Sequence, residues 1–198
     1  MAITKAGLLV LCNNNLERSE TDIDNAIKRV IGKINGKGNF LVETKNTDTI
    51  SSTSTTVAYP TGFKSLNYIR LQRSNNSVTP YLIKKSYGEY LNALSNGVGG
   101  TPDSYTGWNS NFYFYPGPSD DFTVEITYFK NHPQDADTIE YDETKFSTVM
   151  ESGVTFEVAN RYGLTDQINL WGQRYADDLR DVKQFNINPV YNTQWSRF

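Results

Sequence analysis

The sequence predicts an α+β fold in which an N-terminal helix and two C-terminal helices form a bundle beside a small antiparallel β-sheet. Apolar residues recur with helical spacing in residues 19–36 and again in residues 141–182. Between these regions, residues 122–129 alternate apolar and polar side chains, as a half-buried antiparallel strand does. We therefore expect one domain over 1–185, with a β-rich insertion at about 40–130, and an extended tail at 186–198.

The first elements are helical or ambiguous. Residues 7–12 are apolar and predict a first short helix or strand. In residues 19–36, helical spacing brings five apolar residues onto one face, and they are Ile23, Ile27, Val30, Ile31 and Ile34. Ser19 or Thr21 is the expected N-cap, and Gly36 ends the helix. Acidic residues lie in the first half of this helix and basic residues in its second half, which is the arrangement that the helix dipole favours.

The next region is rich in hydroxyl side chains and then in short strands. Eight of the ten residues 47–56 are Ser or Thr, which suits either a solvated β-arm or a flexible loop. Residues 66–72 and 81–83 predict strands, residues 86–92 a helical turn, and residues 96–108 a loop.

An aromatic segment and an alternating segment predict a β-hairpin. Residues 111–115 read Asn-Phe-Tyr-Phe-Tyr, residues 116–121 contain a Pro-Gly-Pro turn, and residues 122–129 alternate. Strand, turn and strand in this order are typical of two paired antiparallel strands.

The C-terminal third predicts two further helices and a tail. The first begins near Tyr141, is weakened in its middle by Gly153 and ends at Gly163. Thr165 is the expected cap of the second helix, whose apolar seam consists of Ile168, Trp171, Tyr175, Leu179 and Val182. The tail has no periodicity, yet it carries Tyr191, Trp195 and Phe198. Large apolar side chains in a tail predict that it packs against its own domain or a neighbour.

Composition excludes several classes of protein. Nineteen Lys and Arg against 22 Asp and Glu give a formal net charge of −3, which argues against a strongly basic nucleic-acid binder. The single Cys excludes an intrachain disulfide framework, and one Cys with one His cannot complete a Cys/His zinc site. No stretch approaches the roughly 18 apolar residues of a membrane span. We expect no cofactor and no metal.

Nothing in the sequence assembles into an active site. His132 has no nucleophile beside it, and Cys12 is interpreted as a small buried hydrophobic residue. The acidic run 135–143 is interpreted as a solvated connector whose last acids favour the following helix N-terminus. The acids at 120–121 fit a turn, and residues 97–100 lack the context of a phosphate-binding loop. Aromatic residues at four positions could stack on sugars or pack within a sheet, with packing favoured: Tyr105, Trp108, Tyr113 and Tyr115.

The order of these elements across about residues 20–185 resembles the head-to-tail adaptor (connector) proteins of tailed double-stranded DNA bacteriophages. The resemblance rests on the helix, the Thr-rich stretch, the Tyr59-Pro60 corner, and the strands with Ile69-Arg-Leu71 and Tyr81-Leu-Ile83. It continues through the aromatic block 112–115, the turn 116–118, the strand 123–128, His132-Pro133, two helices and an aromatic tail.

This resemblance implies a structural virion protein, not an enzyme, located at the neck and assembled in the host cytoplasm. It implies a ring, usually of twelve copies, that lies between the portal protein and tail or nozzle proteins and continues the DNA channel without sequence-specific binding. It also implies that Tyr191, Trp195 and Phe198 dock on the portal.

Two other functions remain open at this point. A carbohydrate-binding module would use Trp108 and its tyrosine neighbours. A hydrolase would depend on His132 or on acidic residues.

Overall fold

The computed structural model of the 198-residue chain describes residues 3–95, 97, 99–137 and 139–187, and it confirms the α+β class. The chain divides into two compact units. The described residues of the first unit are 3–41, 131–137 and 139–187, and those of the second are 42–95, 97 and 99–130. The prediction of one domain over 1–185 with an insertion at about 40–130 and a tail at 186–198 stays a prediction.

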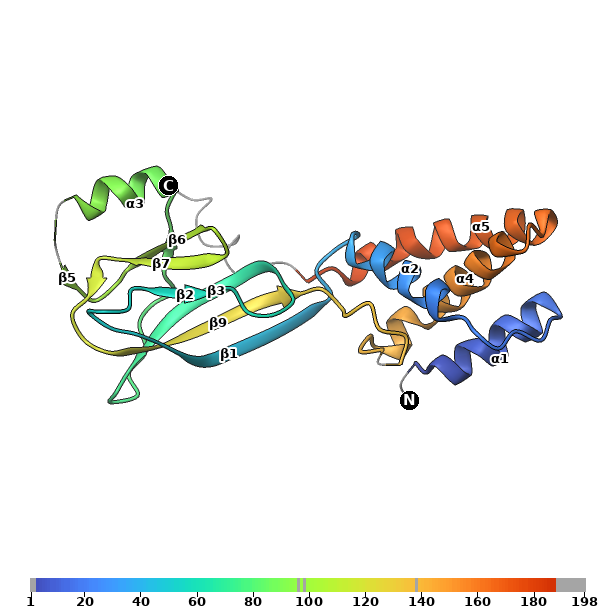
Figure 1. The fold of residues 1–198 in the computed structure, drawn as a ribbon, viewed down its shortest axis with the longest axis horizontal. Helices are drawn as coiled ribbons and strands as arrows, with labels where there is room; N and C mark the ends of the chain where they lie inside the picture. Colours follow the sequence, from blue (N-terminus) through green and yellow to red (C-terminus); the bar gives the residue numbers. More distant parts are fainter. Residues whose placement is uncertain (1–2, 96, 98, 138, 188–198) are drawn as a thin grey trace. The chain divides into compact units, whose positions relative to one another are not determined.

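The first unit is helical, and α4 (Glu143–Arg161) lies at its centre. Helices α1 (Lys5–Leu16), α2 (Asp24–Asn35) and α5 (Thr165–Asp181) each pack along α4 (Figure 1). A short 3-10 helix, η1 (Val182–Phe185), follows α5 and also contacts α4. That these helices form a regular bundle stays a prediction.

Helix α1 resolves the ambiguity of residues 7–12 in favour of a helix. The Thr4 side chain accepts a hydrogen bond from the Gly7 backbone N–H at 3.1 Å, which caps the first turn. The helix ends at Glu17, whose φ of 51° is left-handed.

Helix α2 buries the predicted apolar face but begins later than predicted. Ile23, Ile27, Val30, Ile31 and Ile34 are fully buried in the core of this unit. The cap predicted at Ser19 or Thr21 is wrong, because α2 starts at Asp24 without a side-chain cap. The side chain of Asn13 bonds both the N–H (2.8 Å) and the C=O (3.1 Å) of Glu20, so this backbone is not free to start a helix.

Helices α4 and α5 have nearly the predicted extents. Gly163 has a φ of +65° and separates them, as predicted. The predicted cap at Thr165 is wrong, since Thr165 is the first helical residue and the Leu164 before it makes no capping hydrogen bond. The seam of α5 is confirmed: Trp171, Tyr175 and Val182 are buried, and Ile168 and Leu179 pack on the same core.

The described residues of the second unit form three sheets where one small antiparallel sheet was predicted. The first has the order β1 (Leu41–Ile50), β9 (Phe122–Lys130), β3 (Phe63–Arg73), with β3 antiparallel to β9. The second has the order β2 (Thr56–Ala58), β7 (Asn111–Tyr115), β6 (Ser104–Trp108), β4 (Ile83–Lys84), in which β4 and β6 are parallel. Strands β5 (Gly99–Gly100) and β8 (Gly117–Pro118) form a parallel pair.

Side chains of the two larger sheets share one hydrophobic core. Ile69 and Leu71 of β3 and Val124 and Ile126 of β9 meet Phe112 and Phe114 of β7 there. Helix α3 (Tyr87–Leu94) packs on β6 and β7 and begins with a reciprocal capping box between Ser86 and Glu89.

The predicted hairpin between the aromatic and the alternating strand is wrong. Strand β7 pairs with β6 and β2, whereas β9 pairs in the other large sheet. The hairpin partner of β7 is β6, and their two-residue loop, Asn109 and Ser110, has positive φ at both positions (47° and 59°), as tight hairpin turns require.

Two loops were also assigned wrongly or left open. Residues 104–108, expected to be loop, form β6. In the Ser/Thr-rich stretch, β1 continues to Ile50, the chain turns at 51–54 with a bridge between Ser51 and Ser54, and β2 begins at Thr56. Of the two alternatives, the β-arm therefore holds for part of residues 47–56 and the loop for the turn between the strands.

Candidate functional site

His132 is buried and serves the local fold. Its side chain is 1% exposed, and its Nε2 accepts a hydrogen bond from the Glu140 backbone N–H at 2.6 Å. Because Nε2 accepts, the proton of a neutral imidazole lies on Nδ1, which is 2.5 Å from the Pro133 carbonyl oxygen and donates to it. Both ring nitrogens are thus used to hold the loop between β9 and α4.

Asn35 ties the same loop to the end of α2. Its side chain accepts from the His132 N–H and donates to the His132 carbonyl, both at 2.9 Å. The Tyr141 hydroxyl donates to the same Asn35 oxygen at 2.9 Å, and the Tyr141 ring packs on the imidazole at 4.5 Å. This cluster is a structural brace.

The structure confirms the interpretation of Cys12 as a small buried hydrophobic residue. It is 1% exposed, and burial raises the pKa of its thiol to about 11. A thiol with such a pKa is protonated at neutral pH and is a poor nucleophile.

The last part of the acidic run 135–143 stabilises the N-terminus of α4, as expected. The Asp142 side chain accepts from the Thr144 N–H at 2.9 Å and caps α4, and hydrogen bonds from Thr144 lower the pKa of this carboxyl. In the part of the chain that the structure describes, no group of His, Cys, Asp and Glu side chains is arranged to hold a metal ion.

The candidate stacking aromatics largely pack on one another. Tyr105 is buried, and Tyr113 packs on Tyr90 at 5.6 Å. Trp108 is 54% exposed, but one face of its indole stacks on Tyr87 at 4.7 Å with an interplanar angle of 14°. The favoured packing interpretation holds for these contacts, although Trp108 stays more than half exposed.

The three predicted docking residues, Tyr191, Trp195 and Phe198, lie outside the described residues. The structure does show where the chain that leads to them starts. The Asn186 side chain accepts from the Asn39 N–H at 2.6 Å, and the Ile187 N–H donates to the Asn39 carbonyl at 2.8 Å. Residues 186 and 187 are therefore attached to the segment that follows α2.

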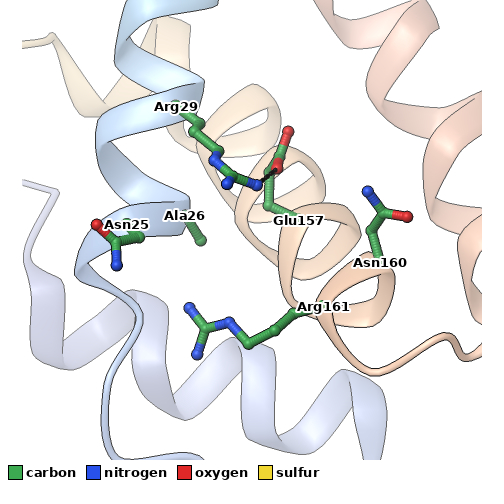
Figure 2. A pocket seen from close by; sticks show the side chains of 6 residues that line it. All are labelled: Asn25, Ala26, Arg29, Glu157, Asn160 and Arg161. Atoms are coloured by element: carbon green, nitrogen blue, oxygen red, sulfur yellow. Dashed lines mark hydrogen bonds and ion pairs between the residues drawn. The ribbon is translucent and has the colours of Figure 1, made fainter.

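A polar hollow of about 270 Å³ lies between α2 and α4 (Figure 2). Helix α2 contributes Asn25, Ala26 and Arg29, and α4 contributes Glu157, Asn160 and Arg161. A second, wider hollow continues along α2 past Lys28 and Lys33.

A buried carboxylate forms the base of this site. Glu157 is 6% exposed and accepts from Lys33 Nζ at 2.8 Å and Arg29 Nη1 at 3.2 Å. The Lys33 ammonium also lies 5.2 Å from the centre of the Tyr175 ring. The pKa of Tyr175 is raised mainly by burial and also by the negative charge of Glu157. The carboxylate thus fixes two cations in position at the α2 surface.

Positive charge exceeds negative charge at the rim of the hollow. Arg161 extends from α4 towards the start of α2 (Figure 2). It donates to the carbonyl of Asp22, which lies two residues before that helix, at 3.1 Å. Among the described residues, no carboxylate lies within ion-pair distance of Arg161. The arrangement suits the binding of an acidic group.

The sequence analysis did not identify this site, although a signal exists. Glu157 falls seven residues after Met150 and eleven after Phe146, on the buried face of α4. A charged residue at the helical spacing of buried apolar residues is itself buried, so it needs an oppositely charged or hydrogen-bonding partner.

The chain as a whole is similar to one known family. Residues 3–195 match the sequence model of a family described as "SU10 adaptor protein". No curated protein matches the chain. None of the described helices is both long and apolar enough to span a bilayer.

Proposed function

The chain belongs to the SU10 adaptor protein family, a family of phage head-tail adaptors, and from this premise we propose that it forms a ring between portal and tail. The family is structural and is not a known enzyme family, and membership implies a virion component that interacts with portal or tail proteins. The observation that carries the proposal is the extent of the match, which covers residues 3–195 of 198.

The proposed ring has twelve copies, is assembled in the host cytoplasm and continues the DNA channel without sequence-specific binding. Each copy carries a net charge of −3, so the ring as a whole is negatively charged and repels DNA phosphates overall. Residues 1–185 are the proposed adaptor domain, with tail or nozzle proteins bound below it.

The proposed portal-docking segment is the tail 186–198, with Tyr191, Trp195 and Phe198 as anchors. Aromatic side chains that enter pockets commonly dominate the energy of an interface. The attachment of Asn186 and Ile187 to Asn39 supports this role, because it gives the anchors a fixed starting point.

The test is a truncation placed after Ile187, which keeps both contacts to Asn39. The full chain and the truncated chain are mixed with the portal protein of the same phage, and rings are counted by electron microscopy, with copy number from particle mass. The full chain should form portal-bound rings of twelve, and the truncated chain should stay folded and unbound. Normal binding by the truncated chain would refute the tail assignment, and a full chain that never binds the portal would refute the adaptor ring.

A matched pair of variants separates the tail from aromatic residues in general. Trp195→Ala should weaken portal binding, whereas Trp108→Ala, which removes an exposed indole on β6, should not.

A further inference from the structure

The solvent side of α2 is a basic face. Within Asp24–Asn35 there are three cations and one carboxylate, and that carboxylate, Asp24, is paired with Lys5 at 2.6 Å. The residues that make up this basic face are exposed, and they are Asn25, Lys28, Arg29, Lys33 and, from α4, Arg161. Glu157 lies beneath them, bonded to Arg29 and Lys33. Among the described residues, Lys28 and Arg161 have no carboxylate at ion-pair distance.

One strip of the solvent side of α5 is acidic, and the exposed Arg174 and Arg180 lie at its two borders. Helix Thr165–Asp181 contains four carboxylates and two arginines. Its outermost residues follow the helical repeat, are all exposed and define the acidic face: Asp166, Leu170, Gln173, Asp177 and Asp181. Leu170, 58% exposed, adds an apolar contact in the middle.

Two of these carboxylates lie where the helix itself disfavours them. Asp177 and Asp181 are in the last turns of α5, next to the negative end of the helix dipole. Asp177 pairs with Arg180 at 2.7 Å, but both side chains are more than half exposed, and such pairs contribute little. A cationic surface from outside the chain would compensate this placement.

The basic face and the acidic face belong to two helices that bond to different residues of α4. Glu157 of α4 points to α2, whereas Ser152 of α4 donates to Asp178 of α5 at 2.5 Å. A closed ring requires that two different surfaces of each subunit meet. We propose that the basic face of one copy binds the acidic face of the next copy, an inference that rests on the proposed ring.

Charge reversal of either face alone tests the contact. One variant carries Lys28→Glu and Arg161→Glu, which leaves the Arg29–Glu157–Lys33 cluster intact. The other carries Asp177→Lys and Asp181→Lys. Counted with Glu157 beneath it, the basic face changes from a charge of +3 to −1 in the first variant, and the acidic face changes from −3 to +1 in the second. In each variant both faces then have the same sign, so portal-bound rings should fall at least about ten-fold in number.

Mixing the two variants makes the test specific. In an alternating ring with an even number of copies, every contact again joins opposite charges, so an equimolar mixture should restore rings. One chain with all four substitutions should also assemble alone. Matched controls with the same charge changes elsewhere, Lys84→Glu with Lys85→Glu and Asp120→Lys with Asp121→Lys, should assemble like the wild type.

The possible contrary results are distinct. If both reversed variants assemble normally, or if mixing restores nothing, the inference fails while the ring stands. If the wild type forms no ring on the portal, the proposed function itself fails. If Lys28→Glu with Arg161→Glu abolishes binding to duplex DNA in fluorescence anisotropy and leaves rings unchanged, the basic face binds nucleic acid and the inference is wrong.

Discussion

Gly153 lies in the middle of α4, and its replacement by alanine should destabilise the protein although alanine is the better helix former. A Cβ at this position would lie 2.7 Å from Tyr175 Cε2 and 2.8 Å from Val30 Cγ2. Tyr175 is 3% exposed and Val30 is fully buried, so neither side chain can move into solvent. The close approach of α2 and α5 to α4 therefore depends on the missing side chain.

The expected size follows from two opposing effects. Alanine gains about 1 kcal/mol over glycine in a helix interior. Overpacking a rigid core costs about 1–3 kcal/mol, and two contacts below 3.0 Å indicate the upper part of that range. The net loss should be about 1–2 kcal/mol, which for a chain of this size lowers the melting temperature by roughly 2–8 °C.

Thermal unfolding followed by circular dichroism measures this effect, with two glycine controls. At Gly32 the Cβ would meet only the flexible end of Gln134 at 3.0 Å, and at Gly88 in α3 it would meet nothing within 4 Å. Gly88→Ala should raise the melting temperature slightly, and Gly32→Ala should change it little. A Gly153→Ala protein as stable as the wild type would show that α4 does not pack as described.

Four further predictions concern single residues. Glu157→Ala should lower the free energy of unfolding by about 1–2 kcal/mol in urea titrations, less than for a fully buried pair because Arg29 and Lys33 are largely exposed, and Glu157→Gln should lose less. Cys12, buried and with a raised pKa, should not react with Ellman's reagent at about pH 8 until the protein is unfolded. Because the pKa of Asp142 is lowered in the folded protein, its carboxylate stabilises the fold above the ordinary pKa, and this stability is lost as the pH falls through the lowered pKa. Asp142→Asn should therefore flatten the loss of stability as the pH falls below about 4. A glycan array should show no binding that Trp108→Ala removes; such binding would favour a carbohydrate-binding module.

Local patterns predicted individual elements well because the physics of an element is local. The face of α2 from Ile23 to Ile34 and the seam of α5 follow from helical repeat alone, and both are buried. The prediction of the N-cap failed where a side chain of the preceding helix bonds the backbone. Asn13 binds Glu20 from another helix, and nothing in residues 19–24 reveals that contact.

Strand pairing was predicted poorly because it depends on residues far apart in the sequence. The alternating pattern of β9 correctly indicated a half-buried strand, but its partner β3 lies some fifty residues earlier in the chain. The short loop at Asn109 and Ser110 was the better hairpin signal, since asparagine tolerates positive φ. The Pro-Gly-Pro segment instead carries the chain from one large sheet to the other.

The bases of α2 show how the same charges acquire a different meaning once the helix is placed. From the sequence, Lys28, Arg29 and Lys33 suit the negative end of a helix dipole. With α2 ending at Asn35, only Lys33 lies in the last turn, so the dipole does not account for Lys28 or Arg29. Glu157 accounts for Arg29 but not for Lys28, which stays exposed and has no carboxylate at ion-pair distance among the described residues. An exposed lysine is ordinary on a solvated surface, and in the proposed ring the acidic face of the next copy would give this one a partner.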